Sequence, residues 1–205
     1  MFCYRSLDYA IDDAWIPARV ARTFLENGVW TYDITRASVE SFSSPLWLGL
    51  HALLLSVAPD ADPVPTLRLF GAGLGIALVM LSAAAAGSMC HTPRNRTIAS
   101  GLTGIALALH PGLMVHAVNG LETSAWLLAL VLGAFGLATR RVNAMAFACV
   151  CLVWLRPEGM LLGPALGLLA WWNHPHGRRV AVLSIGALAV LLLMRQQLYL
   201  SLIHI

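Results

Sequence analysis

The sequence has no lysine and little charge of any kind. Only 11% of its 205 residues are charged, and the 13 basic residues are all arginines, scattered singly and in pairs. A nucleic-acid-binding surface concentrates its basic residues, so this composition argues against that class of partner. With 59% hydrophobic residues and a mean hydropathy of +0.74, the chain has too little polar surface to coat a soluble globule. The composition therefore indicates a protein embedded in lipid.

Two further features are missing from the sequence. The four cysteines show no disulfide framework, and two of them, Cys149 and Cys151, lie inside an apolar run, so we expect all four to be structural. The first ten residues lack the apolar core of a signal peptide and are too short and polar to cross a membrane. Insertion must then be directed by later helices, or by a leading helix that is missing here.

Long apolar stretches make up most of the chain after Leu67, and they are expected to be helices because unpaired strands cannot cross lipid. A span needs about 20 apolar residues, so the first three stretches fit and the last three look short. Residues 46–57 follow a proline and end in APDADPVP, which predicts an interfacial helix. The expected helices cover residues 67–89, 98–118, 121–138, 144–155, 160–172 and 180–194.

The expected fold is all-α, a polytopic transmembrane helical bundle. We predict one membrane domain over residues 1–205. An extracytoplasmic loop with an acidic pair occupies residues 1–45. Residues 46–205 form the interfacial helix and about six transmembrane or half-membrane helices.

Arginines in short loops predict the orientation of the bundle, because positive residues are retained in the cytoplasm. Placing all three arginine loops inside puts the turns at 116–122 and 156–159 outside, together with every acidic residue. If residues 144–172 instead formed one long helix, Arg156 and Glu158 would lie at mid-membrane, which is costly. A hairpin broken at Pro157 and Gly159 is therefore preferred. The loops contain Arg94 and Arg96, Arg140 and Arg141, and Arg178 and Arg179.

The adjacent carboxylates Asp12 and Asp13 are the first candidates for chemistry. They open a probable helix, where exposed amides and the helix dipole favour negative charge, so capping is one explanation. Capping explains one carboxylate better than two, and repulsion between close like charges would raise one pKa toward that of a general base. The sequence leaves both explanations open, and it also leaves open a divalent cation at this pair.

Arg19 and Arg22 share a helical face with Asp12 and Trp15. Such a face could hold a phosphate beside a base. The alternative is a stripe facing solvent or lipid headgroups, in which the arginines contact lipid phosphates.

Three later charged residues flank turns on the same expected face. Arg156 and Glu158 flank Pro157 in an apolar context, where charges are usually functional or paired with each other. Glu122 follows Asn119 and Gly120, and its spacing from Asn119 slightly favours an acid in the first turn of a helix over a functional carboxylate. His116 is a candidate polar lining residue, and His174 and His176 are expected to form part of a basic loop. No metal-binding motif is legible in the sequence.

Four ordered segments resemble the GT-C superfamily of polytopic glycosyltransferases, especially bacterial arabinofuranosyltransferases and mannosyltransferases of cell-envelope assembly. The resemblance covers nearly the whole chain, and the acidic pair with RPEG is its most specific part. The segments are DDAWIPARVARTFLENGVWTYD (12–33), VESFSSPLW (39–47), NGLET (119–123) and LRPEG (155–159).

The resemblance implies transfer of a sugar from a polyprenyl-phosphate donor to a hydroxyl of a glycan, lipid or protein acceptor, typically with inversion. It places the reaction at the extracytoplasmic face of the bacterial cytoplasmic (inner) membrane. Asp12 or Asp13 would be the catalytic base. Arginines would hold the donor phosphate, and Glu122 and Glu158 would orient sugar hydroxyls or these arginines. The implied substrate-binding residues are Arg19, Arg22, Glu40, Glu122, Arg156 and Glu158.

The sequence also departs from the family pattern. Family members usually have a transmembrane helix before the acidic pair and continue beyond the RQQLYLSLIHI end, so we expect a piece truncated at both ends. Ser41 stands where the family tends to have glycine. Two alternatives remain: a transporter or flippase of lipid-linked sugar, which predicts polar residues deep in several helices, and an inactive or non-catalytic membrane subunit.

Overall fold

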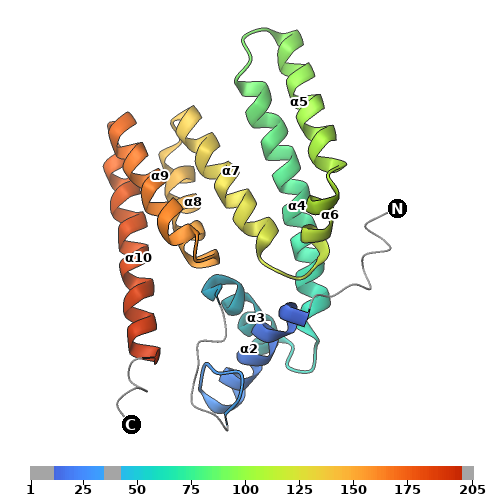
Figure 1. The fold of residues 1–205 in the computed structure, drawn as a ribbon, viewed down its shortest axis with the longest axis vertical. Helices are drawn as coiled ribbons and strands as arrows, with labels where there is room; N and C mark the ends of the chain where they lie inside the picture. Colours follow the sequence, from blue (N-terminus) through green and yellow to red (C-terminus); the bar gives the residue numbers. More distant parts are fainter. Residues whose placement is uncertain (1–11, 35–42, 200–205) are drawn as a thin grey trace.

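The structure is a computed structural model that describes residues 12–34 and 43–199 (Figure 1), and every regular element in these ranges is helical. This confirms the all-α prediction for the described part of the chain. The elements are η1 (Asp12–Ala14), α2 (Trp15–Asn27), α3 (Pro45–Val57), α4 (Pro63–Ser88), α5 (Pro93–Ala108), α6 (Pro111–Val118), α7 (Thr123–Thr139), α8 (Val142–Leu155), α9 (Gly159–Asn173) and α10 (Gly177–Tyr199).

The long helices form two groups that meet along α4 and α7 (Figure 1). In the first group α4 and α5 form a hairpin, and α6 packs against α4. In the second, each of α7, α8, α9 and α10 packs against the next in chain order, and α10 also packs against α8. The helices α2 and α3 pack against each other at one end of this assembly. The chain therefore has a helical body with a separate two-helix layer across one end.

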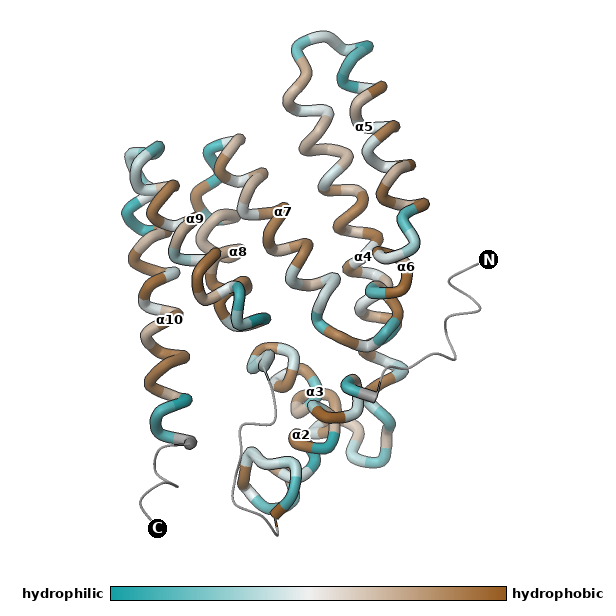
Figure 2. The backbone as a smooth tube through the Cα atoms, viewed as in Figure 1, coloured by the Kyte–Doolittle hydropathy of each residue, from teal (hydrophilic) through white to brown (hydrophobic). Residues whose placement is uncertain are grey.

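Polar loops are divided between the two ends of the body (Figure 2). The three connections that carry paired arginines, α4–α5, α7–α8 and α9–α10, lie at the end away from α2 and α3. The α6–α7 and α8–α9 turns lie at the end where α2 and α3 are. The expected hairpin break is confirmed, because α8 ends at Leu155 and α9 begins at Gly159. Which end faces the cytoplasm stays a prediction.

Two helices in the described ranges are long and apolar enough to cross a membrane: α4, and α10 over Gly177–Gln197. The pair α5 and α6 makes a third candidate if it is counted as one bent span. These helices indicate membrane association. The expectation that 180–194 would be short is wrong, because α10 continues through arginines at both ends and has 23 residues. Long arginine side chains can keep an apolar stem in lipid while their charge reaches water.

Two other expected boundaries are also wrong. Residues 98–118 do not form one helix, because the chain bends by 63° between α5 and α6. Pro111 cannot continue α5, and the His110 ring caps α6 by accepting a hydrogen bond from the Leu113 amide at 3.2 Å. The helix expected at 67–89 begins earlier, at Pro63, because the Asp62 carboxylate accepts from the Val64 amide at 3.0 Å.

Candidate functional site

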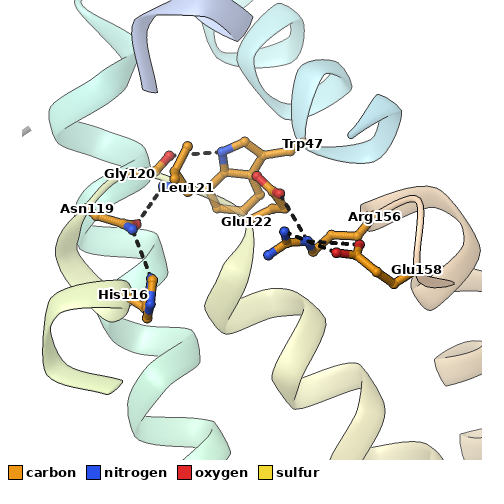
Figure 3. Close-up of polar contacts among 8 residues, drawn as sticks. All are labelled: Trp47, His116, Asn119, Gly120, Leu121, Glu122, Arg156 and Glu158. Carbon is orange, nitrogen blue, oxygen red and sulfur yellow. Dashed lines mark hydrogen bonds and ion pairs between the residues drawn. The ribbon is translucent and has the colours of Figure 1, made fainter. Parts of the chain in front are cut away.

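The NGLET segment forms a rigid turn between α6 and α7 (Figure 3). The Asn119 side chain accepts a hydrogen bond from the Leu121 amide at 2.9 Å and lies 3.2 Å from Nδ1 of His116. Gly120 has φ +86°, a conformation that costs a residue with a Cβ more than it costs glycine. The carbonyl of Gly120 accepts from the Trp47 indole at 3.0 Å. The turn is therefore attached to α3 as well as to its own helices.

Two further elements hold the same turn. Arg68 on α4 donates to the carbonyl of Val118 at 2.8 Å. A Cβ on Gly120 would come within 3.1 Å of the Ala14 methyl and 3.3 Å of the Arg68 stem, so η1 and α4 both approach the turn closely. Sequence reasoning missed Trp47 and Arg68 as positioning residues. Their sequence signal was only a tryptophan early in the interfacial helix and one arginine near the start of an apolar stretch.

Arg156 joins two glutamates at the acidic end of the bundle (Figure 3). Its Nε lies 3.3 Å from Glu158 and 3.9 Å from Glu122. Its guanidinium carbon lies 5.9 Å from the centre of the Trp126 ring, within range of a cation–π contact. The suggestion that Arg156 pairs with Glu158 to shape the turn is therefore partly right, but the same arginine also reaches α7. The guanidinium therefore links the α8–α9 turn to the α6–α7 turn.

Glu122 is the least exposed of these carboxylates, with an 11% exposed side chain against 57% for Glu158. Burial raises the pKa of Glu122 above its ordinary value, and the Glu158 charge adds to this. The backbone amide hydrogen bond and the Arg156 charge oppose the shift. Glu122 occupies the N-cap position of α7 without a side-chain capping hydrogen bond, so the expected placement at the start of this helix is confirmed and the helix dipole favours its charge there.

Glu122 and Arg156 line a cavity of about 260 Å³ that is also lined by Asp13 of the acidic pair. It is lined by Asp13 from η1, by Ser43 and Ser44 before α3, by Glu122 from the α6–α7 turn and by Arg156 from the α8–α9 turn. The hydroxyl of Ser44 is buried and has no hydrogen-bond partner. The volume is near the lower edge of the roughly 300–1,000 Å³ typical of small-molecule sites. This carboxylate–arginine cavity is the candidate site.

Arg19 and Arg22 lie elsewhere. They line a separate cavity of about 780 Å³ with Trp15, Tyr32 and three aspartates, none of which borders the carboxylate–arginine cavity. The expected face of Trp15, Arg19 and Arg22 lines this cavity, and the place of Asp12 on that face stays a prediction. Asp13 lies in the smaller cavity. Two positions on α2, Ile16 and Pro17, line the smaller cavity instead.

The structure does not describe the side chains of two predicted site residues, Glu40 and Asp12. Glu40 lies outside the described residues. Asp12 begins η1, and its side chain lies outside the description. The N-cap position of α2 is Ala14, which has no polar side chain, so Asp13 is not the N-cap residue of α2. The capping explanation therefore does not apply to Asp13.

The remaining candidates are structural. The His174 ring is buried and lies 3.1 Å from the Leu137 carbonyl, so it joins the α9–α10 loop to α7. Cys90, Cys149 and Cys151 are free thiols, as expected, and Cys3 lies outside the described residues. Within residues 12–34 and 43–199 no group of three or more His, Cys, Asp or Glu side chains could hold a metal ion.

Comparison with protein-family models, curated proteins and solved structures finds no match to this chain. The class that the fold and the site define is a helical, membrane-associated protein with a carboxylate–arginine cavity at one end.

Proposed function

We propose that this chain is a membrane glycosyltransferase that moves a sugar from a polyprenyl-phosphate donor to an acceptor hydroxyl. One observation carries the proposal. Asp13, Glu122 and Arg156 come from three segments far apart in sequence and line one cavity at the end of the bundle away from the arginine loops. A base, a buried carboxyl and a phosphate-binding cation are the groups that this transfer needs.

Asp13 acts as the general base. The carboxylate removes the proton from the acceptor hydroxyl while the acceptor oxygen attacks the anomeric carbon of the sugar. The bond between that carbon and the phosphate oxygen breaks, and the polyprenyl phosphate leaves with the electron pair. Asp13 is exposed at the mouth of the cavity, where an acceptor can approach it from solvent.

Arg156 stabilises the negative charge that grows on the leaving phosphate. A guanidinium suits this role because its N–H groups match phosphate oxygens in pairs. Contacts with Glu158 at 3.3 Å and with the Trp126 ring fix the side chain before substrate arrives. Glu122 faces the same guanidinium from the α6–α7 turn and orients it or a sugar hydroxyl. Such a preorganised charge is the most effective kind of electrostatic catalysis.

The test is transfer of labelled sugar from polyprenyl-phosphate donors in membranes that contain the protein. Asp13→Asn and Asp12→Asn are compared with wild type at matched protein levels. Arg156→Gln tests the phosphate contact. Glu26→Gln is the matched control, because Glu26 is an exposed carboxylate on α2 that lines neither cavity.

The proposal predicts loss of transfer in Asp13→Asn and in Arg156→Gln and full transfer in the Glu26 control. Loss of transfer in Asp12→Asn but not in Asp13→Asn would assign the general base to Asp12. Unchanged transfer in both aspartate variants would remove the acidic pair from the chemistry. Movement of intact lipid-linked sugar across the membrane without transfer would instead favour a flippase.

A further inference from the structure

Two arginines and two of the three aspartates that line the larger cavity form no ion pair with each other. Arg19 and Arg22 contribute positive charge from α2, and Asp60 and Asp62 contribute negative charge from the α3–α4 loop. Among the described residues no ion pair joins either arginine to either of these aspartates. The Asp62 carboxylate caps α4 by accepting from the Val64 amide. Opposite charges that share a cavity of about 780 Å³ without contact suit a ligand that carries both charges.

The position of this cavity indicates where such a ligand comes from. Pro63, the first residue of the candidate span α4, is part of its wall. Trp15 and Tyr32 also line it and are 46% and 50% exposed. Tryptophan and tyrosine gather where a membrane meets water, because their rings are apolar and their edges are polar. If α4 crosses the membrane, the cavity lies at the level of the lipid headgroups.

We propose that this cavity binds the zwitterionic headgroup of a phosphoethanolamine-type phospholipid. The two guanidinium groups of α2 hold the phosphate, and the carboxylates of the α3–α4 loop hold the ammonium group. An anionic headgroup such as phosphatidylglycerol would satisfy the arginines but would face the uncompensated aspartates. The inference depends on membrane insertion of α4 and not on glycosyl transfer, so either proposal can fail without the other.

Native mass spectrometry of the purified full chain tests this preference. The protein is exposed to equal amounts of phosphatidylethanolamine and phosphatidylglycerol, and the retained lipids are counted. Soluble phosphoethanolamine and inorganic phosphate are added as competitors, to separate headgroup binding from general phosphate binding. The variants are Arg19→Gln with Arg22→Gln, and Asp60→Asn alone. Asp62 is left intact because it caps α4.

Wild type should retain more phosphatidylethanolamine than phosphatidylglycerol, and the double arginine variant should lose about threefold to fivefold of that retention, the range for exposed charge pairs. Asp60→Asn should shift the preference toward phosphatidylglycerol. Arg94→Gln, an exposed arginine at the other end of the bundle, should change nothing. Equal retention of both lipids by wild type, or equal loss in the Arg94 control, would overturn the proposal. Displacement by inorganic phosphate as efficient as by phosphoethanolamine would also overturn it, because the carboxylates would then contribute nothing.

Discussion

Glu122 shows how a single carboxyl group can be tuned by opposing surroundings. Its side chain is almost excluded from water, which disfavours the ionised form, whereas Arg156 at 3.9 Å favours it. Burial is the larger of the two causes, so the pKa is raised. This property separates Glu122 from the exposed acids around it.

The raised pKa predicts a pH-dependent effect of Glu122→Gln on stability. Between the ordinary pKa of 4.5 and the raised pKa of the folded state, the folded protein binds the extra proton, so its free energy of unfolding falls as pH rises. Glutamine carries no titrating proton and avoids this loss. The melting temperature of Glu122→Gln, relative to that of wild type, should therefore increase as pH rises through this window.

The measurement is thermal unfolding in detergent from acidic to neutral pH, with Glu26→Gln as the control for an exposed carboxylate. The readout is the pH trend of each variant against wild type. A Glu122→Gln variant that loses stability relative to wild type as pH rises would show that the Arg156 attraction outweighs burial.

At this scale the sequence predicted part of the site. Asp13, Glu122 and Arg156 were expected to meet on one side, and they line one cavity. Arg19 and Arg22 were expected beside the acidic pair, but helical spacing relates them to Asp12, whereas the neighbouring Asp13 lies on the other side of the α2 start. In the 3-10 helix η1, a shift of one residue turns a side chain by about 120°. The contributions of Trp47 and Arg68 depend on tertiary contacts that no local pattern encodes.

Helix α9 packs closely against both of its neighbours through small residues on one face. Gly159, Gly163 and Gly167 recur every four residues, so they lie in one row. A Cβ on Gly159 would overlap the Leu152 carbonyl, and one on Gly163 would lie 2.7 Å from the Cys149 carbonyl oxygen. A Cβ on Gly167 would lie 3.0 Å from the Ala181 Cα of α10. Small residues let membrane helices approach in this way.

Gly163→Ala is therefore expected to destabilise the α8–α9 hairpin. The new methyl group would meet backbone of α8, which cannot move aside as a flexible side chain can, and overpacking of this kind costs about 1–3 kcal/mol. Gly73→Ala on α4 is the matched control, because nothing lies within 4 Å of its new Cβ. Removing a helical glycine there should stabilise by about 0.5–1 kcal/mol. The measurement is the melting temperature of both variants in the same detergent, and a Gly163→Ala protein as stable as Gly73→Ala would refute the close packing.

The presence of the helices was predicted better than any other feature of the fold, because long apolar segments in lipid must form helices to satisfy their backbone hydrogen bonds. The break at Arg156–Glu158 was also predicted, from the cost of charge at mid-membrane. The bend at His110 was not, although Pro111 is the local signal for it, because the apolar character of the run continues through the proline. The start of α4 was missed because its signal is the cap at Asp62, outside the apolar stretch.

The whole molecule is polarised from end to end. The paired arginines lie at or beside connections at one end of the bundle (Figures 1 and 2). The two cavities lined by carboxylates and arginines are formed at the other end, by η1, α2 and the loops and turns near them. Arginine-rich short loops stay in the cytoplasm, so both cavities are expected on the extracytoplasmic side. The proposed donor and the proposed lipid headgroup would then be reached from the same side.

Sidedness can be measured with single cysteines in a background without the native ones. Ala61→Cys reports the α3–α4 loop, and His176→Cys reports the exposed α9–α10 loop. An impermeant maleimide should label Ala61→Cys in intact cells and His176→Cys only after permeabilisation. The reverse labelling pattern would invert the molecule in the membrane and place the cavities in the cytoplasm.

The most direct test of the central claim is the kinetics of sugar transfer by Asp13→Asn, with turnover separated from donor binding. If Asp13 is the general base, kcat should fall by about 10²–10⁴-fold while the KM for the polyprenyl-phosphate donor changes far less, because the donor phosphate is held by Arg156. Turnover equal to that of wild type in Asp13→Asn would contradict the assignment of this cavity as the site of transfer.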